Sequence, residues 1–334
     1  MNNVNDWDES FKCFLPYLPR DFEHWIVVYE GSFQSEIASQ LRTRLKSAEF
    51  FNLEEEAGES IRAVGNSNRE NERIGFLEFV IRYPASIYDG HSPGADGLDA
   101  FIMWPQTRVR LCFDVTDNNF RELFSERPED VSERCSRLRD QVAGMEALTY
   151  RNEASGADPL IISCAGSVWT AYTGFGQTFD YVLPSGEVAC LPKSVDGVLP
   201  VEGWIIGTIP FGVKYGRIQK GELELRLEGR RVVSVGGNNR KLCADFEGAL
   251  SSSTRLQRVS EAGIGQSLAV RRAAENHRLG YSWHERHYGL HIGLGAELPR
   301  EDQSNQTKTG GHHLDIVLAT GRLAGPSDPD LLRW

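Results

Sequence analysis

The order of hydrophobic and polar positions changes character near residue 150. Before that point, short apolar runs alternate with segments whose apolar residues recur at helical spacing. That spacing predicts helices over residues 35–50 and 131–148. Strands are expected at 25–29, 75–83, 98–104 and 109–115. Because alternating strands and helices are typical of layered α/β proteins, we expect an α/β layer domain over residues 1–150.

The second half of the chain is dominated by strand patterns. In residues 221–237, leucines alternate with charged residues and a Glu-Gly-Arg turn separates two such runs, which predicts a β-hairpin. A strand is expected at 159–164 and a helix at 241–260. We therefore expect a β-rich α+β domain over residues 151–325, followed by a loosely held tail at 326–334.

Charge and composition exclude several classes of function. The net charge of the 334 residues is −11, which opposes non-specific binding to nucleic acids and to anionic membranes. No apolar stretch is long enough to cross a bilayer, and the polar N-terminus does not have the pattern of a signal peptide. The six cysteines form no CxxC pair, which is typical of reduced thiols. We expect a cytoplasmic protein with neither a nucleic-acid nor a membrane partner.

Histidines are concentrated near the C-terminus. Six of the eight lie between His277 and His313, and the last of them begins the sequence His313-Leu314-Asp315. Imidazoles and carboxylates are common ligands of divalent metals. Residues two apart on a strand share a face, so His313 and Asp315 can bind one ion together. The sequence therefore predicts a metal site in this region.

Four short blocks could supply that site. They are the Pro-Ser-Gly-Glu of residues 184–187, the Glu-Ala-Gly-Ile-Gly of 261–265, the His-Ile-Gly-Leu-Gly of 291–295 and the His-Leu-Asp of 313–315. Three of the blocks contain glycine, which allows backbone and side chains to approach closely around an ion.

The order and rough spacing of these blocks, with the hairpin between them, resemble the aminopeptidase T-type leucyl aminopeptidases from about residue 140 to 322. The resemblance implies a C-terminal metal-binding domain of aminopeptidase T type. It also implies one or two zinc, cobalt or magnesium ions and hydrolysis of a peptide or amide bond by a metal-activated water. The metal ligands that it implies are Glu187, Glu261, His291, His313 and Asp315.

The chain departs from that family in one respect, because no tyrosine follows the block at 291–295 where the peptidases place a further ligand. A related branch, the 2,5-dihydroxypyridine dioxygenases, implies a different centre. Its single Fe(II) would be bound here by His291, His313 and Asp315, two imidazoles and one carboxylate. The substrate would then be a small aromatic molecule instead of a small peptide. A third hypothesis is a catalytically impaired member of the family that binds or tailors peptides.

Three residues are candidates for proton transfer: Glu187, if it is not a ligand, and Glu285 and His287 beside the metal blocks. Each candidate also has a structural interpretation. Glu285 and His287 could be exposed loop residues, and Glu261 could simply end the predicted helix. His313 and Asp315 could form a structural hydrogen bond. Relatives commonly dimerise, so we expect a homodimer by analogy only.

Overall fold

The computed structural model describes residues 7–55, 73–81, 108–152, 158–174, 182–296, 312–326 and 328–334. The chain folds into two compact units. The first contains Met1–Ser132 and Thr173–Ser185, and the second contains Glu133–Tyr172 and Gly186–Trp334. The domains expected at 1–150 and 151–325 stay predictions, and the fold is described below by these two units.

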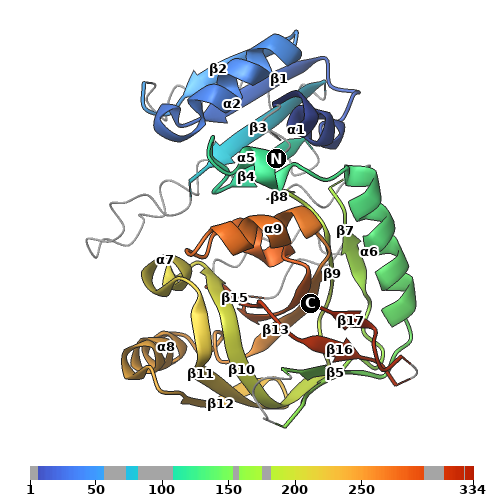
Figure 1. Cartoon of the computed structure of the whole chain (residues 1–334), viewed down its shortest axis with the longest axis vertical. Coiled ribbons are helices and arrows are strands. Elements are labelled where there is room, and N and C mark those ends of the chain that lie inside the picture. The colour runs from blue at the N-terminus through green and yellow to red at the C-terminus, as the bar shows by residue number, and fades with distance from the viewer. Residues whose placement is uncertain are drawn as a thin grey trace, which may run out of the picture. The chain divides into compact units, whose positions relative to one another are not determined.

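The first unit contains a parallel sheet with strand order β2-β1-β3-β4-β8 (Figure 1). Its strands are β1 (His24–Tyr29), β2 (Ala48–Asn52), β3 (Ile74–Val80), β4 (Val109–Phe113) and β8 (Val182–Leu183). Nearly every residue of β3 and β4 is buried, as expected where both faces of a parallel sheet are covered. The sequence therefore predicted three of these strands correctly, while the strand expected at 98–104 lies outside the described residues.

The helices of this unit are α1 (Trp7–Phe14), the 3₁₀ turn η1 (Leu15–Tyr17), α2 (Gly31–Arg44) and α5 (Phe120–Leu123). Helix α2 buries Ile37, Ala38 and Leu41. Ile37 and Leu41 belong, with Leu45, to the helical spacing that predicted this helix. The prediction that this helix continues to residue 50 was wrong. Residues 48–52 instead form β2, which pairs in parallel with β1. The backbone hydrogen bonds of that pairing replace those of further helical turns.

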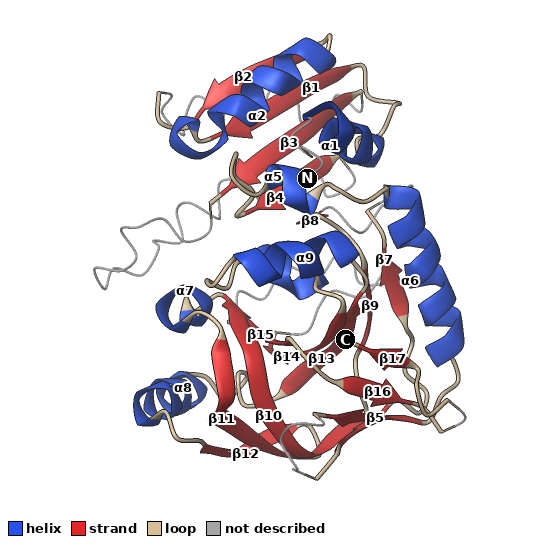
Figure 2. Ribbon diagram, viewed as in Figure 1, coloured by secondary structure: helices blue, strands red, loops and turns tan. Residues whose placement is uncertain are grey.

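The second unit contains a twelve-stranded antiparallel sheet (Figure 2). Its strands are β5 (Ala147–Arg151), β6 (Leu160–Ser163), β7 (Thr170–Tyr172), β9 (Glu187–Cys190), β10 (Ser194–Gly207), β11 (Ile218–Glu228), β12 (Arg231–Gly236), β13 (Val259–Gly265), β14 (Gly289–Gly295), β15 (His313–Leu318), β16 (Arg322–Ala324) and β17 (Leu332–Arg333). Its helices are α7 (Phe211–Tyr215), α8 (Arg240–Ser252), α9 (Leu268–Asn276) and η3 (Ser282–Arg286). Helix α6 (Pro128–Val142) begins in the first unit and ends in the second.

The strand β10 lets this sheet curl. It pairs first with β6, then with β11 and finally with β15, and the register shifts between Val201 and Gly203. Such an irregularity bends a strand and increases its twist. A parallel sheet followed by a large antiparallel sheet confirms the expected combination of α/β and α+β parts at this level of detail.

Two predicted helices end earlier than their spacing indicated. Helix α6 stops at Val142, and residues 147–151 form β5. Helix α8 stops at Ser252, and β13 starts at Val259. Glu261 consequently lies inside a fully buried strand and does not end a helix, which removes one structural interpretation of that residue.

Strand pairing and aromatic packing hold the end of the chain. Strand β17 pairs with β16, and the Trp334 ring stacks on Tyr150 and donates from Nε1 to the Leu318 carbonyl over 2.9 Å. Trp334 also packs on Gly289, where a Cβ would lie 2.4 Å from the indole Nε1. The tail expected at 326–334 stays a prediction, while burial of an indole and a backbone pairing hold residues 332–334 in this structure.

The structure can be compared with the expectations about the cysteines and about membrane crossing. All six cysteines are free thiols, as expected from their scattered positions. Within the described residues, no helix combines the length and the apolar character that a bilayer crossing requires.

Glu78, in the middle of β3, provides a first testable prediction. Its side chain is fully buried, and neither carboxylate oxygen has a hydrogen-bond partner among the described residues. Burial raises its pKa well above the ordinary value. A group with a raised folded-state pKa contributes stability below the pKa of the unfolded chain. That contribution is lost as pH rises towards the folded-state value.

We therefore expect Glu78→Gln to gain stability relative to the parent as pH rises above about 4.5, with a gain of about 1–3 kcal/mol at neutral pH. Urea unfolding at pH 4.5 and pH 8 measures the difference. The exposed Glu49 of β2, in the same sheet, is the matched control, since Glu49→Gln should show little pH-dependent gain. A constant difference at all pH values for Glu78→Gln would contradict the prediction.

Candidate metal centre

Strand pairing places the four sequence blocks on one face of the antiparallel sheet. Strands β9, β13, β14 and β15 lie side by side in the order β9-β13-β14-β15. Directly paired residues share a face of a sheet, as do residues two apart on one strand. The pairs that matter are Glu187 with Gly265, Gly263 with His291, Glu261 with Gly293, Gly293 with Asp315, and Gly295 with His313. All five predicted ligands consequently project from the same face.

Two glycines make room for these side chains. A Cβ at Gly263 would lie 2.1 Å from His291 Nε2 and 2.5 Å from Glu187 Oε1. A Cβ at Gly293 would lie 2.8 Å from Glu261 Cβ and 3.2 Å from Asp315 Oδ1. Even the smallest side chain at either position would enter the space where the polar atoms meet. The glycines of the blocks at 261–265 and 291–295 therefore keep this space open.

The polar atoms converge around Glu261. Its Oε1 lies 3.6 Å from His291 Nε2 and its Oε2 lies 3.9 Å from His313 Nε2. His291 Nε2 lies 2.9 Å from Glu187 Oε1, and His313 Nε2 lies 2.9 Å from Asp315 Oδ1. One carboxylate thus stands between two imidazoles, each with a second carboxylate of its own.

These donors form two groups, each compact enough for one ion. Glu187, Glu261, Glu285 and His291 form the first group, and Glu261, His313 and Asp315 form the second. Within each group the donor atoms lie within 4.8 Å of one another. Glu261 belongs to both groups. The structure therefore places His291 in one group and His313 with Asp315 in the other, connected by this carboxylate.

Several buried atoms of the site lack a well-aligned hydrogen bond among the described residues, although two of them, Glu187 Oε1 and His291 Nε2, lie 2.9 Å apart. They are Glu187 Oε1, both oxygens of Glu261 and His291 Nε2. Each of these three residues is 1% exposed. Buried polar atoms are normally paired, and unpaired ones carry a substantial desolvation cost. A cation in the space above Gly263 and Gly293 would satisfy them, so the donor set fits a divalent metal.

The charges of the site depend strongly on one another. Burial raises the pKa of Glu261 to about 8, helped by the negative charge of Glu187. Burial also disfavours ionised Glu187, but Arg286 and His291 outweigh it and lower the pKa of Glu187 to about 2. For His313, burial lowers the pKa but Asp315 raises it further, to about 10. In the metal-free protein, protons and Arg286 therefore balance the carboxylates.

One further contact orients His313 for metal binding. Its Nδ1 lies 2.9 Å from the Ala296 carbonyl oxygen, an acceptor that fixes the proton on Nδ1. The Nε2 atom is then the one that faces Glu261 and Asp315. Metal-binding histidines commonly use such a partner to fix the tautomer.

The two other candidates for proton transfer lie in different environments. Glu285 is partly buried and belongs to the first donor group, beside Arg286. His287 is buried against the Trp204 ring, 5.7 Å between centroids, and is in neither donor group. Burial and the charges of Arg271 and Arg217 lower the pKa of His287 to about 3. Glu285 therefore lies at the centre, whereas His287 forms part of an aromatic cluster with Trp204.

The sequence analysis missed Arg286. This residue is buried, contacts Glu187 through Nη1, and lies 3.0 Å from Glu285 Oε1 through the same atom. It lies in η3, immediately before β14. A single arginine between Glu285 and His287 carries no recognisable spacing, so nothing in the sequence distinguished it from a surface cation.

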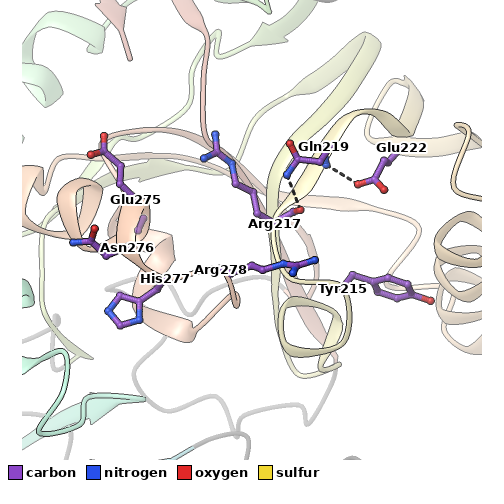
Figure 3. Close-up of a pocket in the computed structure, with 9 residues that line it drawn as sticks. Tyr215, Arg217, Gln219, Glu222, Glu275, Asn276, His277 and Arg278 are labelled. Atoms are coloured by element: carbon purple, nitrogen blue, oxygen red, sulfur yellow. Dashed lines mark hydrogen bonds between the residues drawn. The ribbon is translucent and has the colours of Figure 1, made fainter.

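A separate cavity of about 400 Å³ opens elsewhere in the same unit (Figure 3). It is lined by Tyr215, Arg217, Gln219, Glu222, Ala274, Glu275, Asn276, His277 and Arg278. None of these residues belongs to either donor group. His277, the first of the six clustered histidines, lines this cavity and not the metal centre.

Comparisons with known proteins connect the fold to one enzyme. No protein-family model and no curated protein matches the sequence, so neither comparison supports membership of the aminopeptidase T family. The fold is similar to the solved structure of 2,5-dihydroxypyridine dioxygenase from Pseudomonas putida KT2440. The TM-score is 0.61 at 14% identity, over 98% of this chain and 95% of that one. The chain thus has the fold of that dioxygenase and contains, within it, a buried group of Glu, His and Asp that could hold a metal ion.

Proposed function

We propose that this protein is a metal-dependent dioxygenase that cleaves a small hydroxylated aromatic ring, with one Fe(II) bound by His291, His313 and Asp315. The observation that carries the proposal is the arrangement of two imidazole Nε2 atoms on either side of Glu261, one of them in contact with Asp315. Two histidines and one carboxylate are the usual protein ligands of non-haem Fe(II) oxygenases. The shared fold with a dioxygenase supports the same assignment.

The metal would supply the activation of O₂, and the ring would supply the electrons, so that both oxygen atoms enter the product without an added reductant. The protein's own residues would hold the substrate and its protons. Glu261 has a pKa of about 8 and can give up a proton when a cation binds beside it. Glu187, held ionised by Arg286, is a weak base but can accept a hydrogen bond from a ring hydroxyl.

A hydrolase is the second candidate. The sharing of Glu261 between two donor groups favours it, because a carboxylate between two ions is a common arrangement in hydrolases that activate water with a metal pair. The substrate would then be a small peptide or amide. This candidate requires two ions, whereas the dioxygenase requires one.

Metal content and O₂ uptake separate the two proposals. Protein purified anaerobically is loaded with Fe(II), or separately with Zn(II) or Co(II). Each sample is then assayed with dihydroxylated pyridines and with leucine amides. We expect one O₂ consumed per ring lost, with Fe(II) only. Amide hydrolysis with Zn(II) or Co(II), without O₂ uptake under any loading, would replace the dioxygenase by the hydrolase.

A further inference from the structure

We propose that Arg286 is a built-in cation that takes the place of a second metal ion, so that this centre binds a single divalent ion. The inference rests on the proposed metal centre but not on the reaction it performs. Among the described residues of the second unit, Arg286 is the cation that contacts the first donor group through two of its members, Glu187 and Glu285.

The contacts of Arg286 already balance the charge of two donors that a second ion would need. The first group contains four residues, and the guanidinium Nη1 contacts Glu187 Oε2 and Glu285 Oε1, one oxygen of each carboxylate. Of the two remaining members, Glu261 also belongs to the second group. A second ion at the first group would therefore have to share its carboxylates with the arginine and with the first ion. Such a set is a poor site for a second divalent cation.

The charge of Arg286 also opposes a second ion. A guanidinium remains protonated under all ordinary conditions, so it cannot become neutral when a metal approaches. Arg286 is 6% exposed, and Glu187 beside it is 1% exposed, so little water screens the repulsion between the guanidinium and a divalent ion. Without Arg286, Glu187 and Glu285 would instead be two buried carboxylates with no cation between them.

The remaining donors suffice for one ion. Glu261, His313 and Asp315 lie within reach of one another, and His291 Nε2 faces Glu261 from the other side. In this proposal one ion uses the second group together with His291, and the charge of Arg286 balances Glu187 and Glu285 of the first group. The geometry thus favours a centre with one ion, although the set of residues resembles that of a centre with two.

Metal stoichiometry of the full-length protein tests this inference without any activity measurement. Titration of metal-free protein with Co(II), followed by calorimetry and elemental analysis, should give one ion per chain. In Arg286→Met we expect two ions, with the second bound at least about 100-fold more tightly than in the parent. Arg286→Lys retains the charge and should bind one. Arg271→Met removes a nearby arginine outside both donor groups and should also bind one.

The outcomes separate this inference from the proposed reaction. Two ions in the parent, or one in folded Arg286→Met, would overturn it. If Arg286→Met unfolds without metal, recovery of its melting transition with two equivalents of Co(II) supports it, and no recovery at any ratio overturns it. If the parent protein binds no ion, the proposed metal centre is wrong. If it binds one ion but shows no O₂ uptake, only the proposed dioxygenase reaction is wrong.

Discussion

Asp315→Asn is expected to lower metal affinity and metal-dependent activity by more than about 100-fold, a larger loss than that caused by removing a group that only orients a ligand. The asparagine has nearly the same shape but no charge, so it cannot compensate a cation. It also removes the largest influence that raises the pKa of His313, which would therefore fall. Calorimetric titration with Co(II) and O₂ uptake with Fe(II) measure the two losses.

The neighbouring histidine provides the control. His312 is exposed, and its Nδ1 lies 3.3 Å from the Thr208 hydroxyl, away from both donor groups. His312→Ala should therefore keep the metal affinity and activity of the parent, whereas His313→Ala should lose both. If His312→Ala and His313→Ala lose metal to the same degree, the ligand at this position has been misassigned.

Gly263→Ala is expected to abolish metal binding through a single added methyl group. The new Cβ would lie 2.1 Å from His291 Nε2 and 2.2 Å from its Cε1, so the imidazole would have to leave its position. His291 is buried and its surroundings are closely packed, which makes that movement costly. Overpacking of this kind lowers the free energy of unfolding by about 1–3 kcal/mol. Co(II) titration and thermal unfolding measure both effects.

Two other glycines calibrate this result. Gly248, in helix α8, has no atom within 4 Å of an added Cβ, so Gly248→Ala should leave metal binding unchanged and stabilise the helix by about 0.5–1 kcal/mol. Gly293→Ala brings its Cβ 2.8 Å from Glu261 Cβ and should have an intermediate effect. Normal metal affinity in Gly263→Ala would mean that His291 is not a ligand in the folded protein.

The periodicity of apolar residues identified much of the fold, because each position of a strand is apolar or polar according to its own burial. The alternation of leucines in β11 and the apolar runs of β1, β3 and β4 are direct consequences of burial, so they could be recognised without a structure. The ends of α2 and α8 could not, because they depend on which neighbouring strand is available for pairing. The burial of Trp334 depends likewise on Gly289, a position far away in the sequence.

In the candidate centre too, relations between residues close in the sequence could be predicted, whereas those between distant residues depended on the fold. His313 and Asp315 share a face of one strand, and two-residue spacing was sufficient to connect them. The relation of Glu187 and Glu261 to the histidines was implied by the resemblance to the aminopeptidase T-type peptidases. The distances between these side chains depend on the register of four strands. Nothing in the sequence indicated the role of Arg286, because a sequence alone does not distinguish a buried arginine from an exposed one.

The register of β13, β14 and β15 has a mechanical consequence for the folded protein. An ion bound by His291 of β14 and by His313 and Asp315 of β15, next to Glu261 of β13, would connect these neighbouring strands through side chains, in addition to their backbone hydrogen bonds. Such a cross-link closes loops in the unfolded chain, much as a disulfide does, and the cost of closing them grows only slowly with their length. Removal of the ion by a chelator would then lower the stability of the sheet. The metal would stabilise the fold in addition to its part in the reaction.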